Sequence, residues 1–451
     1  MAFVVVKVGG ANALWNKGVM SRRFRLHLSR AWQGLRRDGW VRTWDRSSDF
    51  LRRMVPWTPR HALVRPSAAC IDALTEVPCA ESPLVSIVIP VFNKVEYTLE
   101  CLAALVASGD ATNYEAIVVD DGSSDATADR VSGLKGVRYT RNPSNEGFIG
   151  SCNRGAELAR GEFLVFLNND TAVQPGWLDA MVSTFQAHPK AGLVGAKLLY
   201  GDGTLQEAGG ILYKDGRGGN YGRFDAALDP RYTHVREVDY CSGAAIAIRK
   251  ELFEQLGRFD DRYRPAYYED ADLAMRVREA GYKVLYQPHS VVIHFEGITS
   301  GTSEAGGVKA YQVRNREVFL ERWRERLLSD HPAWGLPLDL AVARGQATLM
   351  VFDDGDAAVK SAAVITHLLA DGRSLMVLMK GGTLPSSWQH QWEQQGVEIW
   401  SGYWRTGLRG WVRRYGSRVA EVRVTSDADA STFGRLWRAR PEVRVVRMDN
   451  P

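Results

Sequence analysis

The chain of 451 residues is long enough for two or three domains, each with its own core. Its 45% hydrophobic and 24% charged residues are typical of a soluble globular protein, and no run approaches the roughly 18 apolar residues of a membrane-spanning helix. The N-terminus lacks a signal-peptide pattern, which argues against secretion. Five scattered cysteines without CxxC spacing argue against a disulfide framework or a zinc site, so reduced thiols in a cytoplasmic protein are expected.

A basic, aromatic arm and linker are predicted over residues 1–80. The net charge of +5 is uneven, because residues 1–65 carry 14 Lys and Arg against three Asp. Phe24, Leu28, Trp32 and Leu35 recur at helical spacing with arginines between them. Two interpretations remain open: a helix lying on an anionic membrane surface, or a helical arm packed on the next domain.

The next region, residues 83–330, alternates apolar runs with helical patterns. Short apolar runs suit strands that are buried on both faces, and they lie at 84–92, 116–119, 137–140 and 163–167. Helices are expected between them at 95–108, 126–134 and 148–159. This βαβ alternation predicts an α/β fold with an open, mainly parallel sheet.

A third region, residues 345–451, repeats the α/β pattern. Strands are expected at 348–352, 374–379, 397–400, 419–425 and 443–447, with a helix at 357–369. The order predicts a second, Rossmann-like unit.

Two polar clusters follow predicted strands at their carboxyl ends, where open parallel sheets bind ligands. Asp120-Asp121-Gly122-Ser123 follows the second strand, and Asn168-Asn169-Asp170 follows the fourth. Each cluster alone is also a common turn sequence, because Asp, Asn and Ser bond their own backbone.

Taken together, several blocks resemble the family-two inverting glycosyltransferases. The resemblance covers about half the chain. Within the family, the chain is most similar to the branch that builds bacterial surface polysaccharides, which includes rhamnosyltransferases. The blocks that carry it, in order, are Val85-Ser-Ile-Val-Ile-Pro-Val-Phe-Asn93, Val118-Val-Asp-Asp-Gly-Ser-Ser-Asp125, Asn142-Pro-Ser-Asn-Glu-Gly147, Leu167-Asn-Asn-Asp-Thr171, Gly243-Ala-Ala-Ile-Ala-Ile-Arg249, Gly257-Arg-Phe-Asp260 and Tyr268-Glu-Asp-Ala-Asp-Leu273.

This resemblance implies the A-type glycosyltransferase fold, a nucleotide-binding sheet joined to an acceptor half. It implies a nucleotide site in which Pro90 and Asp120 contact the base and Asp121 the nucleoside. The remaining residues assigned to the nucleotide by the resemblance are Asn145, Gly147, Asn153 and Asn169.

The resemblance also implies a divalent cation, Mg²⁺ or Mn²⁺, bound by Asp170 to neutralise the leaving diphosphate. Asn168 replaces the first acid of the usual Asp-x-Asp motif and can still coordinate through its amide oxygen. His294 follows an apolar run and matches a metal-binding histidine of the family, although a histidine after a strand is often purely structural. An imidazole ligand would favour Mn²⁺. His289 is a weaker candidate.

Asp270 matches the family's catalytic base, which takes the proton of the acceptor hydroxyl. The alternative is helix capping, since Glu269 and Asp270 precede a helical pattern. Asp272 and Arg276, spaced i,i+4, predict a simple surface pair. Arg276 or Arg278 is a further candidate for the diphosphate.

We expect acceptor contacts from residues 240–245 and 263–268, and mobile loops at 216–222 and 297–307. The implied function is transfer of a sugar from a nucleotide diphosphate sugar to a hydroxyl of a glycan or lipid-linked glycan during surface polysaccharide (O-antigen) synthesis. A hexosyltransferase in the cytoplasm is expected, either free or attached to the inner face of the membrane through its arm, with no nucleic-acid partner.

Two other functions are weighed against this one. The first is a catalytically silent, nucleotide-binding scaffold of a glycan-assembly complex. The second is a nucleotidyltransferase, which would need a Gly-rich loop after the first strand that the sequence lacks. Residues 345–451 resemble the first half of a B-type glycosyltransferase, and alone they suggest an interaction or truncated module.

Overall fold

A computed structural model describes residues 61–295, 310–336, 341, 347–401, 407–438 and 440–448. The chain divides into two compact units, Met1–Thr58 and Pro59–Pro451, and the second is described below. The helical arm predicted over residues 20–54 and the loop predicted at 297–307 lie outside the described residues. Within the described ranges, no helix is both long enough and apolar enough to cross a bilayer.

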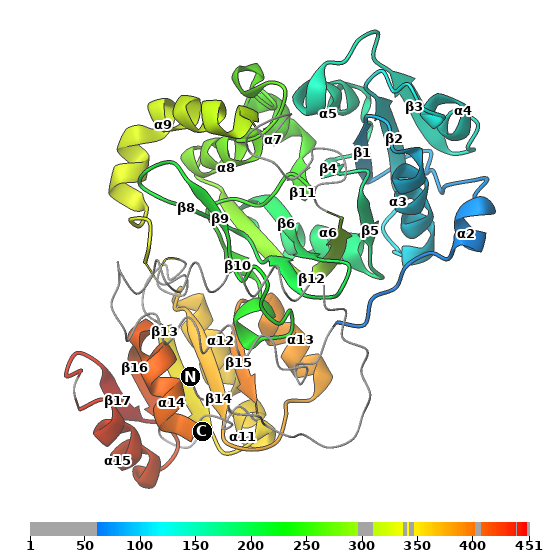
Figure 1. The fold of residues 1–451 in the computed structure, drawn as a ribbon. Coiled ribbons are helices and arrows are strands. Elements are labelled where there is room, and N and C mark those ends of the chain that lie inside the picture. Colours follow the sequence, from blue (N-terminus) through cyan, green and yellow to red (C-terminus); the bar gives the residue numbers. More distant parts are fainter. Residues whose placement is uncertain are drawn as a thin grey trace, which may run out of the picture. The chain divides into compact units, whose positions relative to one another are not determined.

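A ten-stranded mixed sheet forms the larger part of the second unit (Figure 1). Its main path runs β10-β12-β6-β11-β4-β1-β2-β3, with β5 paired to β12 and β7 paired to β6. The strands are β1 (Val85–Val91), β2 (Tyr114–Asp120), β3 (Val137–Arg141), β4 (Phe163–Leu167), β5 (Thr171–Val173), β6 (Ala191–Leu199), β7 (Leu205–Glu207), β10 (Arg236–Glu237), β11 (Ala245–Arg249) and β12 (Lys283–His294).

The prediction of a mainly parallel sheet holds for one half and needs correction in the other. Strands β3, β2, β1 and β4 are mutually parallel, as the βαβ pattern predicts. Beyond them, β11 runs antiparallel to both β4 and β6. The chain passes directly from β11 into α7 (Lys250–Gln255). Two short strands, β8 (Gly210–Leu212) and β9 (Gly218–Asn220), form a separate hairpin, and β9 lies within the predicted mobile loop 216–222.

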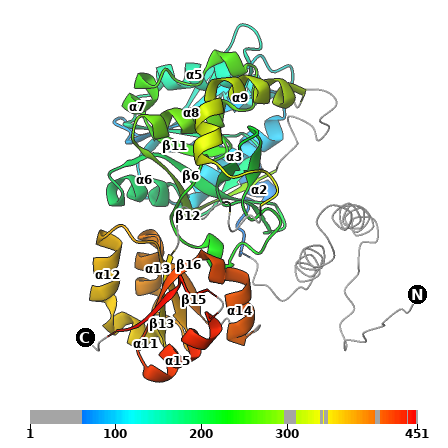
Figure 2. The ribbon, with the colours of Figure 1, turned by 90° about the vertical axis from the view of Figure 1, so that its left-hand side faces the viewer.

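Helices cover both faces of the large sheet, so strand residues are apolar on both sides (Figures 1 and 2). In β1, Ile87 and Ile89 belong to the core formed with α3 (Val95–Ser108) and α6 (Trp177–Ala187), whereas Val88 faces the opposite core. That second core is built by α5 (Gly147–Leu158), α7, α8 (Glu269–Glu279) and α9 (Ala310–Asp330). This two-sided burial explains the continuous apolar runs.

The C-terminal region forms a five-stranded sheet in the order β15-β14-β13-β16-β17, with every pair parallel. Counted along the chain, this order is 3-2-1-4-5, that of a doubly wound Rossmann-like unit, as predicted. Figure 2 shows α12 and α13 on one side of this sheet and α14 on the other. The strands are β13 (Ala347–Phe352), β14 (Leu375–Met379), β15 (Glu398–Ser401), β16 (Val419–Val424) and β17 (Arg444–Arg447).

One helix of this unit differs from its prediction. The single helix expected at 357–369 is two helices, α11 (Gly355–Lys360) and α12 (Ala362–Ala370), which meet at Ser361. Asp354 caps α11 by accepting a hydrogen bond from the Ala357 N–H, which places the start of the helix two residues earlier than expected. The other helices are α13 (Ser386–Gln394), α14 (Gly407–Tyr415) and α15 (Asp427–Leu436).

Candidate active site

Asp120 is the last residue of β2, and its carboxylate is completely buried. It accepts hydrogen bonds from the Ser123 N–H at 2.8 Å and the Tyr139 hydroxyl at 2.6 Å, and it pairs with Arg141 at 2.9 Å. The turn interpretation is therefore correct for the Ser123 bond. Arg141 remains substantially exposed, so the paired charges lie at the edge of the sheet, where a ligand can reach them. The contact with a nucleobase stays a prediction.

Asp121 organises the next segment. Its carboxylate accepts the backbone N–H of Glu146 at 2.8 Å and of Gly147 at 2.9 Å, and also the Asn142 side-chain amide at 2.8 Å. Gly147 has φ 75°, and a Cβ there would lie 2.7 Å from Pro265, so only glycine fits. These bonds fix the N-terminus of α5 at the carboxyl end of β2, where the Asp121 carboxylate is itself the anion that the first N–H groups bind.

The remaining residues assigned to the nucleotide differ in how available their side chains are. Pro90 is buried in β1 opposite Val119, and Asn145 is exposed. The Asn153 amide is engaged on both sides by the Phe259 backbone, at 2.9 and 3.1 Å. Asn169 is buried and donates to Thr98. The last two side chains are thus held by the protein itself, and their nucleotide contacts stay predictions.

Asn168, Asp170 and His294 converge between the ends of β4 and β12. His294 Nε2 lies 3.4 Å from Asp170 Oδ1 and 3.5 Å from Asn168 Nδ2. On the other side of the ring, His294 Nδ1 lies 3.0 Å from Gln206 Oε1, an acceptor, so Nδ1 donates to it and Nε2 faces Asp170. Gln206, which the sequence did not single out, fixes this orientation in the way typical of metal-binding histidines.

These residues fit a divalent cation by their chemistry. The carbonyl oxygen of the Asn168 side chain is buried and has no hydrogen-bond partner, a costly arrangement that a cation would relieve. With the amide turned so that this oxygen replaces Nδ2 beside His294 Nε2, it would join a carboxylate and an imidazole nitrogen in a mixed donor set. Among the described residues, no three His, Cys, Asp or Glu side chains are grouped as a metal site. The proposed donor set therefore depends on the oxygen of Asn168.

Asp270 lies in the first turn of α8, and its carboxylate accepts the Gly243 N–H at 3.0 Å. Tyr268, not Asp270, is the N-cap of α8, but the Asp270 carboxylate also accepts the first-turn N–H of Ala271 at 2.7 Å, so the capping interpretation holds in part. Burial, as the dominant cause, raises the pKa of Asp270 above its ordinary value. Desolvation outweighs the opposing effect of the Gly243 and Ala271 N–H groups, so the Asp270 carboxylate is a stronger base than an ordinary aspartate.

The segment before Asp270 is strained. Tyr267 and Tyr268 have φ of 77° and 73°, in a region that bulky residues rarely adopt. The Asn315 side chain of α9 holds this segment by donating to the carbonyl oxygens of Tyr263, Ala266 and Tyr267 at 2.6 to 3.1 Å. Strain that the surroundings enforce is common at active sites.

Two further buried carboxyl groups lie beside Asp270. Glu207 of β7 accepts the Ser242 N–H at 2.9 Å, and burial raises its pKa to about 7, with Asp270 adding to the shift and His294 opposing it. Glu269 Oε2 is buried without a partner, and burial raises the pKa of this residue well above its usual range. Sequence reasoning missed Glu207, because its only signal is an acid beside Gln206 in an apolar stretch.

The Asp272–Arg276 pair exists at 2.7 Å, but the prediction of a surface pair is wrong. Asp272 is fully buried and also accepts bonds from Tyr263, Arg322 and Trp323. The pair lies on the side of α8 that packs into the core, and residues of α9 cover it.

Neither arginine proposed for the diphosphate is positioned for that role. Arg276 donates to the Leu256 carbonyl at 2.6 Å, and Arg278 lies 3.6 Å from Asp239. His289, the weaker metal candidate, lies 3.5 Å from Glu393, and burial lowers its pKa to about 4. The described contacts therefore leave His294 as the histidine of the candidate site.

The aromatic residues expected to contact the acceptor are mainly structural. The Tyr240 ring fills the space beside Gly210 and Gly218, where added Cβ atoms would lie 2.2 and 2.8 Å from it. Tyr263 is buried and donates to Asp272, and Tyr268 donates to the Gly216 carbonyl.

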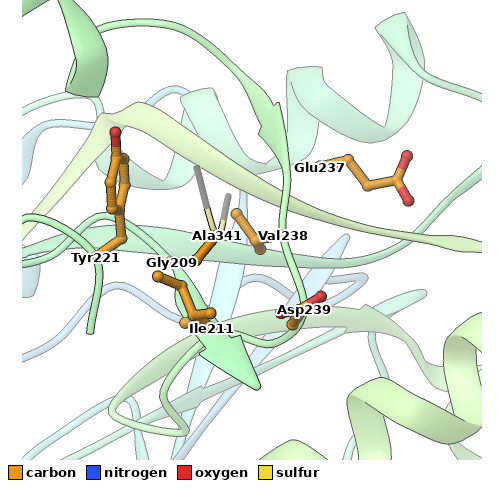
Figure 3. A pocket seen from close by; sticks show the side chains of 8 residues that line it. Gly209, Ile211, Tyr221, Glu237, Val238, Asp239 and Ala341 are labelled. Carbon is orange, nitrogen blue, oxygen red and sulfur yellow. The ribbon is translucent and has the colours of Figure 1, made fainter. Parts of the chain in front are cut away.

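A separate small pocket lies beside β8 and β10 and contains none of the predicted site residues (Figure 3). Ile211, Val238 and Ala341 gather in its centre, and the Glu237 carboxylate points away from them. Glu237 pairs with Lys283 at 3.3 Å, and Asp239 accepts the Leu212 N–H at 2.8 Å. Because both acids are already engaged, we assign the pocket no chemical role.

Comparison with known proteins identifies the domain that holds this geometry. Residues 86–257 match Glycosyl transferase family 2. The chain thus carries a domain of that family, and its mixed sheet is the A-type glycosyltransferase fold predicted from the sequence. The matched span includes Asp120, Asp121 and Asp170, whereas Asp270 and His294 lie beyond it.

Two curated relatives come from bacteria. The O-antigen biosynthesis protein RfbC of Myxococcus xanthus is 31% identical over 241 residues, which are 51% of this chain and 19% of that protein. The N-acetylglucosaminyl-diphospho-decaprenol L-rhamnosyltransferase of Mycobacterium tuberculosis (strain ATCC 25618 / H37Rv) is 26% identical over 249 residues, 49% of this chain and 79% of the relative. The chain spans less than a third of the first curated relatives that it matches.

Among solved structures, the crystal structure of GalNAc-T7 with UDP, GalNAc and Mn²⁺ is similar with a TM-score of 0.44 and 19% identity. The similarity covers 54% of this chain and 49% of that one. At this level the neighbour transfers no property to the present chain.

Proposed function

We propose that this chain is an inverting glycosyltransferase that moves a sugar from a nucleotide diphosphate sugar to a hydroxyl group of a glycan or lipid-linked glycan in surface polysaccharide synthesis. One observation carries the proposal: a half-buried carboxylate, Asp270, is tied through the backbone to the cluster of Asn168, Asp170 and His294. Gly243 donates to Asp270, and the carbonyl of the next residue, Ala244, accepts the Asn168 N–H at 3.0 Å. The proposed base and the proposed diphosphate site are therefore both hydrogen-bonded to the backbone of Gly243 and Ala244.

The residues divide the work of an inverting displacement. Asp270 accepts the proton of the acceptor hydroxyl as its oxygen attacks the anomeric carbon, on the face opposite the leaving diphosphate. Asp121 holds the N-terminus of α5 in place by accepting the Glu146 and Gly147 N–H groups. Asn168, Asp170 and His294 would hold Mg²⁺ or Mn²⁺, which supplies Lewis-acid stabilisation of the diphosphate as the bond breaks.

The relatives support the acceptor class of the proposal. One relative is named for O-antigen biosynthesis and the other for L-rhamnosyl transfer to N-acetylglucosaminyl-diphospho-decaprenol. A cytoplasmic enzyme that meets a lipid-linked acceptor at the inner face of the membrane would be consistent with the basic arm, which carries 14 Lys and Arg in residues 1–65.

The test is release of nucleoside diphosphate from a panel of uridine, thymidine and guanosine diphosphate sugars, with Mn²⁺ and with a chelator. We expect slow hydrolysis of one donor, with water as the acceptor, that depends on Mn²⁺ and is lost in Asp170→Ala. Nucleotide binding without turnover of any donor would instead favour the scaffold. Equal hydrolysis in Asp170→Ala would contradict the metal site but not the transferase.

A further inference from the structure

An aromatic pair lies at the protein surface and takes no part in the mechanism above. The rings of Tyr200 and Phe224 stack with centroids 5.2 Å apart and 8° between their planes. Phe224 keeps 43% of its surface exposed, and the Arg223 guanidinium lies 5.3 Å from the centre of its ring. A large exposed ring beside a cation is an arrangement that binds ligands as well as packing.

Phe224 is also held in an unfavourable backbone conformation. Its φ of 69° lies in the left-handed region, where a bulky side chain is a genuine outlier. The turn is fixed by the Phe224 N–H, which donates to the Leu205 carbonyl at 2.7 Å, and by the Asp225 N–H, which donates to Gly222 at 2.8 Å. The Asp225 carboxylate in turn accepts the Tyr232 hydroxyl at 2.6 Å. A strained residue that presents its ring to solvent is typical of a functional position.

The pair is connected to the candidate site through β7. Leu205, which holds Phe224, is followed by Gln206, the partner of His294, and by the buried Glu207. The positive charge of Arg223 acts on Glu207 and lowers its pKa, opposing the effect of burial. The pair therefore lies within electrostatic reach of the carboxyl groups beside Asp270.

The sheet order decides which substrate the pair would meet. Asp120 and the α5 segment belong to the β1-β2-β3 side of β4, where the nucleotide is placed. Tyr200 follows β6, and Phe224 bonds to β7, on the other side of β4 (Figure 1). This placement is on the acceptor half and away from the nucleotide.

We propose that Tyr200, Arg223 and Phe224 form a subsite for one pyranose ring of the acceptor. The inference rests on the proposed function and extends it to a particular binding surface. The C–H face of the sugar would pack on the exposed Phe224 ring, since such faces are apolar, while Arg223 donates hydrogen bonds to the hydroxyl oxygens. An apolar platform with one fixed polar group is the usual composition of a small-ligand site.

Saturation-transfer NMR on the full chain tests this subsite directly. The probes are the methyl pyranosides of glucose, galactose, N-acetylglucosamine and rhamnose, each at millimolar concentration and without nucleotide. We expect at least one probe to receive saturation, and the signal to fall at least five-fold in Phe224→Asn. Asparagine tolerates the left-handed backbone, so this variant removes the ring without adding strain. Phe224→Trp should restore the signal.

Trp334→Ala is the matched control, because Trp334 is 47% exposed and has Arg217 4.7 Å from its ring centre. It should leave the signals unchanged. The subsite is overturned if no pyranoside receives saturation from the wild type, or if Phe224→Asn leaves the signal intact.

Donor hydrolysis separates this failure from failure of the proposed function. Phe224→Asn should hydrolyse the donor at the wild-type rate to within two-fold, while the KM for an accepted pyranoside rises at least five-fold. Absent hydrolysis in the wild type would count against the transferase, whatever the NMR result.

Discussion

The carboxylates of Glu207 and Asp270 are held by successive backbone N–H groups, those of Ser242 at 2.9 Å and Gly243 at 3.0 Å. Two acids anchored on adjacent amides in a buried setting cannot both ionise easily. Burial raises the pKa of each. With a pKa of about 7, Glu207 exchanges its proton near neutral pH, beside a carboxyl group whose pKa is also raised.

Replacing Glu207 by glutamine should change how stability depends on pH. The folded pKa of about 7 exceeds the ordinary 4.5, so the wild type loses stability as pH rises from about 4.5 to 7. Glu207→Gln removes this loss. The free energy of unfolding of the variant, relative to that of the wild type, should therefore rise by up to roughly 3 kcal/mol across that window. Urea unfolding at pH 5 and pH 8, with a chelator present, measures the difference. An equal difference at both pH values would show that Glu207 has an ordinary pKa.

Metal affinity should follow the contacts around His294. Asp170→Ala should abolish Mn²⁺ binding, and His294→Ala should weaken it strongly. Gln206→Leu removes the acceptor of the Nδ1 proton, so the loss should be roughly 10-fold or more. Calorimetric titration with Mn²⁺ gives the affinities. His289→Ala is the control, and a loss of affinity in that variant equal to that of His294→Ala would place the metal elsewhere.

The buried Asp272 should matter for stability and not for chemistry. Asp272→Asn leaves Arg276 without its partner in the core, which typically costs about 3–5 kcal/mol. Asp330→Asn breaks the Arg326–Asp330 pair, which has the same i,i+4 spacing but is about 40% exposed, and should cost less than about 1 kcal/mol. Denaturant unfolding of the two variants compares them. Similar losses would mean that Asp272 does not carry the core interaction described.

Much of the fold could be predicted because the signals are local. Strand β4 and helix α3 have the bounds expected from the apolar runs, and Asp120 and Asp170 lie at the strand ends where the alternation places them. Burial could not be predicted for the Asp272–Arg276 pair, because it depends on α9, a helix some 40 residues further along the chain. The same holds for Glu207, whose partners Ser242 and Asp270 are distant in sequence.

The acceptor side shows the same limit. Residues 240–245 and 263–268 were expected to present aromatic rings, and the structure instead uses Tyr240 and Tyr263 for packing and support. Phe224 gave no periodic signal, because its exposure follows from a positive φ set by a bond to Leu205.

The most direct measurement of the central claim is donor hydrolysis by Asp270→Asn, with nucleotide affinity measured on the same sample. The account predicts a rate reduced by about 10²–10⁴-fold, as expected for loss of a general base, with nucleotide affinity nearly unchanged. Asp261→Asn, a change at a side chain that is 66% exposed in the neighbouring segment, should behave as the wild type. Wild-type turnover in Asp270→Asn would contradict the assignment of Asp270 as the base.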